Sequence, residues 1–386
     1  MIDAKERQVL DWTGVLEKIS MDCVLHSTWE YVDRSPLAKN AEQARERFLL
    51  IKEIWQLLDE GEDIPLMGLV DFRDLMEPVR TGSLFEISDW VQIKNGVEQV
   101  FRLKEWLLAQ VDRFEYLSTE MILCQVDASL VDLLSSSFDA QGQLSENYYP
   151  QLFHLRQKKL QIRQAIEEEL QALLSDSSIQ KQLQEQFITE RNGRYVLPMK
   201  RTYQRKMGLS HGVSRSGETV YVEPLSVLPL SNSLQEVESQ YVQEIKQILE
   251  RLSRQLRSEI DHLNEAFYVI LELDFRRACA VLGRRWKGAI PIIGEEGVFS
   301  ARNLKHPLLI GQGTVVGNDF HLSSKHPAAI FSGPNAGGKT IALKSIGLAC
   351  LMTRLGLPIP AKDGLRVDFF DRIFADIGDA QTVADG

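Results

Sequence analysis

The sequence predicts a mixed, mainly α-helical fold: a helical core, long coiled-coil helices carrying a small β insert, and then part of an α/β domain. Apolar residues recur at helical spacing in several long stretches before residue 282. A glycine-rich segment with β-type runs interrupts them at about 191–224. A glycine loop then lies between an apolar run and a helix pattern. We therefore predict three domains, at 1–135, 136–287 and 288–386.

The first predicted domain consists of short helices with polar connections. One helix pattern runs from Ala41 to Asp59, and Gly61, Pro65, Gly68 and Gly82 interrupt the segments that follow. We expect a helical core that positions other parts of the chain.

Long helices are predicted on both sides of the insert, at about 144–190 and 231–282. The second stretch contains neither Gly nor Pro, and its apolar residues alternate at steps of three and four, as in a coiled coil. Such a helix is about 75 Å long at 1.5 Å per residue. We interpret the pair as an outgoing and a returning arm with the insert at its tip. Two core helices of a large bundle are the alternative, although lengths beyond about 25 residues favour a coiled coil.

The insert is strongly basic within an acidic chain. Its β-type runs are Tyr195–Met199 and Thr219–Val222, and no Asp or Glu occurs between 191 and 217. Basic residues on a small β element suit contact with a phosphate backbone, although a solvated basic face without a ligand is the alternative. The candidate nucleic-acid-binding residues are Arg191, Arg194, Lys200, Arg201, Arg205, Lys206 and Arg215.

The overall charge and hydropathy exclude two broad classes of protein. The formal net charge of −10 is not that of a general polyanion binder, so nucleic-acid binding must come from a local surface. The longest apolar run, around 346–352, is too short to cross a bilayer, and the first residues lack a secretory signal pattern. We expect a cytoplasmic protein.

The glycine loop follows Ala328–Phe331, which is predicted to be a buried parallel strand, and precedes a helix pattern over Ile341–Met352. Strand, glycine loop and helix form the context of a P-loop NTPase domain, which predicts binding of ATP. The predicted phosphate-binding residues are Gly333, Pro334, Asn335, Ala336, Gly337, Gly338, Lys339 and Thr340.

Each residue type in this loop has a chemical reason. Glycines allow backbone N–H groups to turn toward phosphates, and the helix that follows directs its positive end at the anion. Lys339 is expected to contact the β- and γ-phosphates, and the Thr340 hydroxyl to coordinate Mg²⁺.

ATP hydrolysis requires a second acidic residue at the end of an apolar strand. Only 46 residues follow Thr340, and neither Val367–Asp371 nor Ile373–Asp376 fits that pattern well. We expect that the chain stops within its ATPase domain and binds ATP without turning it over. The alternative is that Asp376 or Asp379 reaches the metal.

Several motifs resemble the MutS family of DNA mismatch-repair ATPases, and in particular its second bacterial branch, often called MutS-two. They are GRYVLPMK at 193–200, SRSGETVYVEP at 214–224, LKHPLL at 304–309, GPNAGGKT followed by LKSIGL, IPA at 359–361 and DIGDAQ at 376–381. The resemblance is strong after Arg191 and looser before it.

The resemblance implies a core, lever helices, a DNA-facing clamp and an ATPase, in that order. It implies homodimers whose ATP sites are completed across the interface, without a mismatch-reading domain. It also implies a role in DNA repair and in suppressing recombination at branched or mismatched DNA, independent of sequence. Lys305 replaces the arginine that usually precedes His-Pro in the family. The Walker B strand, the signature loop and the small nuclease domain are not found in this sequence, so endonuclease activity is not carried over.

Two other functions remain open from the sequence. One is a ribosome- or RNA-associated clamp acting in ribosome rescue, a role that the resemblance also implies. The insert contains few aromatic residues for stacking on bases beyond Tyr195, Tyr203 and Tyr221, which leaves DNA and RNA both open. The other is a coiled-coil chromosome-organising ATPase. This alternative is the least favoured, because in that class the phosphate loop precedes the long helices, whereas here it follows them.

Overall fold

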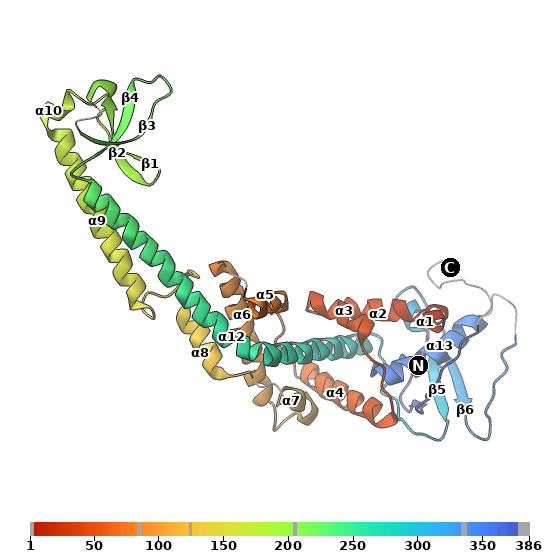
Figure 1. Ribbon diagram of the computed structural model, residues 1–386. Helices are drawn as coiled ribbons and strands as arrows, with labels where there is room; N and C mark the ends of the chain where they lie inside the picture. The colour runs from red at the N-terminus through yellow and green to blue at the C-terminus, as the bar shows by residue number, and fades with distance from the viewer. Residues whose placement is uncertain (1–3, 83–85, 123–125, 204–206, 333–337, 377–386) are drawn as a thin grey trace. The chain divides into compact units, whose positions relative to one another are not determined.

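The computed structural model describes residues 4–82, 86–122, 126–203, 207–332 and 338–376 (Figure 1). The chain is mainly α-helical with small antiparallel sheets, as the sequence predicts. It divides into two compact units. Unit 1 contains Met1–Glu77, Asn95–Ala128 and Glu259–Gly386, and unit 2 contains Pro78–Lys94 and Ser129–Ser258. The three domains predicted from the sequence stay a prediction.

Helices make up the first part of the chain, as the sequence predicts, although Ala41–Asp59 and Ile87–Leu108 are longer than the short helices expected there, with 19 and 22 residues. They are α1 (Ala4–Val9), α2 (Trp12–Ser20), α3 (His26–Arg34), α4 (Ala41–Asp59), η1 (Arg73–Leu75), α5 (Met76–Thr81), α6 (Ile87–Leu108), α7 (Glu115–Ile122) and α8 (Ala128–Ser137). Helix α4 begins at Asn40, whose side chain accepts a hydrogen bond of 2.8 Å from the Gln43 backbone N–H. Its apolar face packs through Ala44 and Phe48 against Ile293 in unit 1.

The start of α3 is capped by a side chain from a distant part of the chain. Asp274 is fully buried and accepts hydrogen bonds of 2.9 Å from the backbone N–H groups of Val24 and Leu25. The Thr28 hydroxyl donates a third bond of 2.7 Å to the same carboxylate. A carboxylate at a helix N-terminus satisfies orphan N–H groups and complements the helix dipole, so Asp274 fixes the position of α3.

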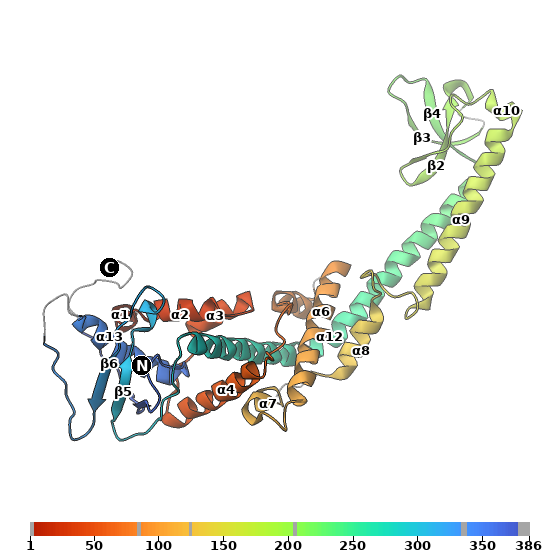
Figure 2. The ribbon, with the colours of Figure 1, turned by 180° about the vertical axis from the view of Figure 1, so that it is seen from behind.

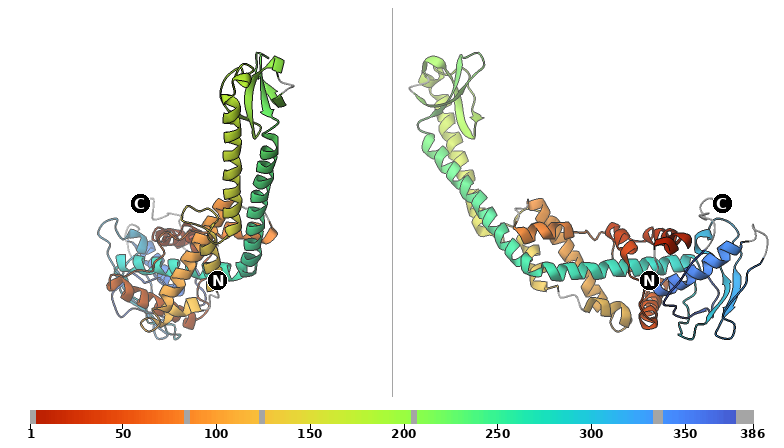
Figure 3. Two further views of the ribbon diagram at one scale, coloured as in Figure 1. Left: turned by 90° about the vertical axis from the view of Figure 1, so that its left-hand side faces the viewer. Right: turned by 45° about the vertical axis from the view of Figure 1, so that its right-hand side comes forward.

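Unit 2 is built on two helices that run side by side, α9 (Pro150–Ser175) and the first part of α12 (Leu228–Arg285) (Figure 3). Ile166 and Leu170 of α9 belong to one buried cluster with Leu234 of α12. The long helix predicted over 231–282 is confirmed. The prediction of a helix over 144–190 was too long, because the side chain of Asp176 accepts from the Ser178 N–H and begins the separate short helix α10 (Ser177–Gln180).

A four-stranded antiparallel sheet, which we call the insert sheet, joins these two helices (Figure 2). Its strands are β1 (Thr189–Arg191), β2 (Arg194–Lys200), β3 (Gly208–Val213) and β4 (Thr219–Pro224), in the order β1-β2-β4-β3. The single turn η2 (Arg201–Tyr203) follows β2. Leu197 is paired with Val222 and Met199 with Val220, and all four side chains are buried against the helix pair. Both predicted β-type runs are therefore confirmed.

Unit 1 contains a three-stranded antiparallel sheet and the helix that follows the glycine loop. The strands are β5 (Phe299–Leu304), β6 (Asn318–Leu322) and β7 (Arg366–Val367), the turn η3 is Pro307–Leu309, and the helix α13 is Lys339–Leu355. The predicted helix is confirmed. The predicted strand over 328–331 is wrong for this structure, because none of the described segments pairs with it and the Ile330 side chain is 96% exposed.

Among the described residues, no helix combines the length and the apolar character that crossing a bilayer requires.

Candidate functional site

The first turn of α13 carries the end of the predicted phosphate loop. Gly338 lies at φ 75°, in the left-handed region that glycine adopts without strain, and directly precedes Lys339 and Thr340. Lys339 is half-buried and Thr340 is exposed. The first turn of a helix presents unpaired N–H groups and the positive end of the helix dipole. This end of α13 is therefore suited to an anion. The other predicted loop residues, Gly333, Pro334, Asn335, Ala336 and Gly337, lie outside the described residues.

A cavity of about 840 Å³ adjoins the start of α13. Lys339 and Ala342 line one side, and Gln312, Thr314 and Val316 of the β5–β6 connection line another. A volume in this range accommodates a nucleotide-sized ligand. This second wall was not predicted from the sequence. The close spacing of Gly311 and Gly313 was the signal available there, and in the structure both residues lie at positive φ.

Residues near the N-terminus hold the middle of α13. The Lys344 ammonium forms an ion pair of 2.7 Å with Asp11, and these side chains are only 5% and 9% exposed. One turn further along α13, Gly347 has no side chain, and a Cβ there would lie 2.8 Å from Leu10 Cδ2. Leu10 thus packs directly on the helix backbone. The sequence analysis did not predict this contact, because it joins segments at opposite ends of the chain.

His306 lies in the same region and is only 1% exposed. Burial, the main cause, lowers its pKa to about 4, and the Asp11 and Lys344 charges act in opposite directions. Neither ring nitrogen has a hydrogen-bond partner among the described residues. His306 is therefore neutral in the folded protein at pH values well above 4.

The buried imidazole predicts a specific loss of stability in mild acid. The unfolded chain takes up a proton near pH 6.5 and the folded chain only near pH 4, so stability is lost as pH falls through this window. Between pH 7 and pH 5, we expect His306 to contribute a loss of about 2 kcal/mol to the free energy of unfolding. Urea unfolding at the two pH values should show that His306→Gln removes this part of the loss. An equal loss in both proteins would contradict the prediction.

Two arginines bind the carbonyl end of α13. Arg276 of α12 donates from Nη1 to the Leu355 carbonyl, and Arg47 of α4 donates to the Arg354 carbonyl at 2.7 Å. Cations at a helix C-terminus complement its dipole. Arg276 is 1% exposed and pairs with Glu272 at 2.6 Å. Burial alone would raise the pKa of Glu272, but the Arg276 charge and a hydrogen bond from Tyr31 outweigh it and lower the pKa.

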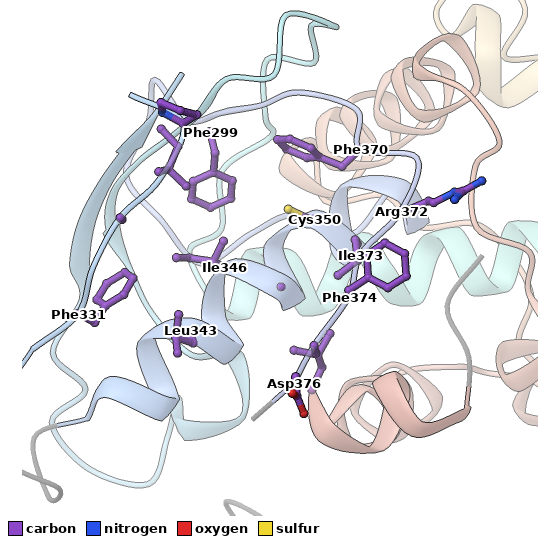
Figure 4. A pocket seen from close by; sticks show the side chains of 16 residues that line it. Phe299, Phe331, Leu343, Ile346, Cys350, Phe370, Arg372, Ile373, Phe374 and Asp376 are labelled. Atoms are coloured by element: carbon purple, nitrogen blue, oxygen red, sulfur yellow. The ribbon is translucent and has the colours of Figure 1, made fainter. Parts of the chain in front are cut away.

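An apolar groove of about 460 Å³ lies along another face of α13 (Figure 4). Leu343, Ile346 and Cys350 of the helix line it together with phenylalanine side chains, including Phe299 and Phe331. Asp376, considered above as a metal ligand, lines this groove rather than the cavity beside Lys339. Asp379 lies outside the described residues.

The predicted nucleic-acid-binding residues lie on or beside the insert sheet, but they are not equivalent. Arg201 and Arg215 are exposed, and Arg191 is exposed with its guanidinium over the Tyr221 ring at 4.5 Å. Lys200 is exposed and donates to the Lys181 carbonyl at 2.9 Å. Arg205 and Lys206 lie outside the described residues.

Arg194 has a different environment from the other basic residues. It forms an ion pair of 3.3 Å with Glu223, which is fully buried, and a hydrogen bond of 2.9 Å with Asn232. Glu223 also contacts His211 Nε2 at 2.7 Å. The charge of Arg194 is compensated by Glu223, so Arg194 stabilises the sheet and is not a free cation for a ligand. This pairing was not predicted from the sequence, because Glu223 lies beyond the acid-free segment on which the prediction rested.

The structure is that of a mainly α-helical protein with two candidate phosphate-binding surfaces. One is the insert sheet at the end of a helix pair, and the other is the start of α13 at Gly-Lys-Thr, beside a large cavity. No family model matches the chain. Most of the chain is nevertheless similar to proteins named Endonuclease MutS2, and these similarities support the MutS2 family, in agreement with the motifs in the sequence.

Three of these relatives illustrate the extent of the similarity. The protein from Acetivibrio thermocellus is 31% identical over 325 residues, which are 83% of this chain and 41% of the relative. The protein from Alkaliphilus oremlandii is 28% identical over 385 residues, 99% of this chain and 49% of the relative. The protein from Aquifex aeolicus is 29% identical over 377 residues, which are 97% of this chain and 49% of the relative. The chain thus spans about half the length of the curated relatives it matches, or somewhat less.

Proposed function

We propose that this chain is the ATP-binding and DNA-binding clamp part of a MutS2-type protein that acts in DNA repair and in suppression of recombination on branched or mismatched DNA. The observation that carries the proposal is the start of α13, where Gly338 and Lys339 line a cavity of about 840 Å³ and Thr340 follows them in the first turn. The similarity to Endonuclease MutS2 proteins over most of the chain supports it.

The described residues fit a nucleoside triphosphate with Mg²⁺. The positive end of α13 and the Lys339 ammonium would compensate the phosphate charges, and the Thr340 hydroxyl would be a ligand for the metal. The adjoining cavity has room for the base and the ribose. When bound, Mg²⁺ would neutralise part of the triphosphate charge.

Titration with a fluorescent ATP analogue, with and without Mg²⁺, tests this part of the proposal. We expect saturable binding that Mg²⁺ strengthens and that unlabelled ATP displaces. Binding of the analogue that ATP cannot displace would contradict the assignment.

The DNA-binding part of the proposal is based on the insert sheet. Its exposed arginines carry charge on a small sheet at the end of a helix pair, which suits contact with phosphates rather than with base edges. We propose that this contact is independent of sequence.

Reversing two of these charges should weaken binding to branched duplex DNA and flatten its salt dependence. For Arg201→Glu with Arg215→Glu, the slope of log K against log salt should fall in magnitude by about 2, because each lost phosphate contact accounts for about 0.9. Fluorescence anisotropy over a series of salt concentrations measures the slope. Lys158→Glu with Lys246→Glu, on the exposed sides of α9 and α12, is the matched control.

Equal slopes for the insert-sheet variant and the control would place the DNA contact elsewhere. Parallel titrations with ribosomes test the alternative partner. A charge reversal that weakens ribosome binding but leaves branched-DNA binding unchanged would favour the ribosome-associated clamp.

A further inference from the structure

A second surface in unit 2 combines arginine with tyrosine. It is an open groove of about 560 Å³ between α8, the start of α9 and α12. We call it the Arg–Tyr groove and define it by the residues that carry its chemistry. They are Leu133, Tyr148, Tyr149, Arg251, Leu252 and Arg254. None of the described residues that line it is acidic.

The aromatic wall of the groove is held in place by the fold. Tyr149 is 8% exposed, and its hydroxyl is hydrogen-bonded at 2.8 Å to the Ser137 hydroxyl of α8. The Tyr148 ring packs edge-to-face on the Tyr149 ring, with centroids 5.0 Å apart, yet remains 48% exposed. A half-exposed ring supported from behind is an aromatic surface ready for stacking, with little ordering entropy left to lose on binding.

The two arginines of the groove are weakly engaged within the protein. Arg251 lies 3.5 Å from Glu244, which also accepts a hydrogen bond of 3.0 Å from Gln151, and its side chain remains 54% exposed. Within the described ranges, Arg254 donates only to the Glu250 carbonyl of its own helix, and no carboxylate lies within ion-pair distance of it. Exposed pairs of this kind contribute little to stability, so both guanidinium groups are available to an anionic ligand.

We propose that the Arg–Tyr groove binds a single nucleic-acid strand, with a base stacked on Tyr148 and neighbouring phosphates on Arg251 and Arg254. An aromatic ring beside cationic side chains is the combination by which proteins hold unpaired strands. A base within a duplex is already stacked and cannot reach such a ring. The apolar side chains of Leu133 and Leu252 would contact the base, whereas an acidic peptide would use the arginines and leave the ring unoccupied.

The position of the groove along α12 extends the proposed function. The inference rests on that function in one respect, namely that the chain binds nucleic acid. The insert sheet joins α12 at Leu228 and the groove includes Arg251, so the two surfaces are about 35 Å apart along the helix. A branched DNA offers a duplex arm and an unpaired strand within such a distance. The groove therefore assigns the unpaired strand of a branch to α12 and the duplex arm to the insert sheet.

The test compares fluorescein-labelled oligo-dT with a blunt duplex of equal length, by anisotropy, in variants that keep the melting temperature of the parent. Tyr148→Ala should weaken oligo-dT binding about tenfold and Tyr148→Phe should leave it unchanged, because stacking needs the ring and not the hydroxyl. Arg251→Ala with Arg254→Ala should lower the salt slope for oligo-dT by about 1.4, the value for two contacts to a single strand. Lys158→Ala with Lys246→Ala, which removes two charges outside the groove, should change neither.

Photo-cross-linking gives a readout that does not depend on affinity. Oligo-dT with 5-bromodeoxyuridine should cross-link at Tyr148, as mass spectrometry of the digested complex identifies. Parental oligo-dT affinity in Tyr148→Ala, or cross-links confined to the insert sheet, would overturn the inference. So would displacement of oligo-dT by polyglutamate at equal charge, which would mark an acidic-protein surface. The insert-sheet variant Arg201→Glu with Arg215→Glu separates the two proposals, since it should weaken duplex binding while the groove still binds oligo-dT.

Discussion

Lys339→Ala should weaken ATP binding by about 2–4 kcal/mol, or roughly 30- to 1,000-fold, because the triphosphate would lose the ammonium group that we propose contacts it. Lys339 is the first residue of α13 and lines the adjoining cavity, so its loss removes a charge at the end of the helix where we propose that the phosphates bind. The dissociation constant of a fluorescent ATP analogue measures the effect.

A matched lysine outside the cavity controls for the change in net charge. Lys362 is exposed in the same unit, and Lys362→Ala should bind the analogue as the parent does. Equal affinities in all three proteins would show that the nucleotide binds elsewhere or not at all.

The second large effect is expected at the other end of α13. Arg276→Ala removes the partner of Glu272 and a buried donor to the Leu355 carbonyl, and leaves the Glu272 carboxylate, whose side chain is 23% exposed, without its paired arginine. Removing one partner of a fully buried ion pair typically costs about 3–5 kcal/mol, and we expect the lower end of this range because Glu272 is partly exposed. The free energy of unfolding, measured by urea denaturation at neutral pH, should fall by that amount.

Lowering the pH should narrow the difference in the free energy of unfolding between Arg276→Ala and the parent. The pKa of Glu272 is lowered in the folded parent, so this stabilisation is present above the unfolded pKa and is lost as pH falls below it. Arg34→Ala serves as the control, because Arg34 and its partner Glu30 are 81% and 76% exposed and such a pair contributes little. A loss for Arg276→Ala no larger than that for Arg34→Ala would contradict the prediction.

The parts of the fold that could be predicted from the sequence are those encoded locally. The long helix α12 follows from an uninterrupted apolar repeat, and β2 and β4 follow from short β-type runs separated by glycines. Arg194 and residues 328–331 show the limit. Arg194 forms an ion pair with Glu223 of a neighbouring strand, which the local sequence does not reveal. Residues 328–331 have the composition of a strand, but a segment is a strand only when another segment pairs with it.

The same limit applies to the candidate site. The motif predicted the start of α13, because Gly338, Lys339 and Thr340 are consecutive in the chain. The wall formed by the β5–β6 connection and the contact between Asp11 and Lys344 depend on tertiary packing, for which one sequence carries no periodic signal. The Arg–Tyr groove is of this kind as well, since α8, α9 and α12 each contribute only part of it.

The capping of α3 by Asp274 has a consequence for synthesis of the chain on the ribosome. Asp274 and Leu25, whose N–H donates to the Asp274 carboxylate, are 249 positions apart, and Lys344 and Asp11 are 333 positions apart. At about 5–20 residues per second, the first helices would wait on the order of ten seconds to a minute for the residues that complete their packing. During that interval Val15, Leu16 and Ile19 of α2, which are buried in the finished fold, would still be accessible to water. We therefore expect α2 and α3, which are made well before Asp274 and Lys344, to need protection by chaperones during this interval.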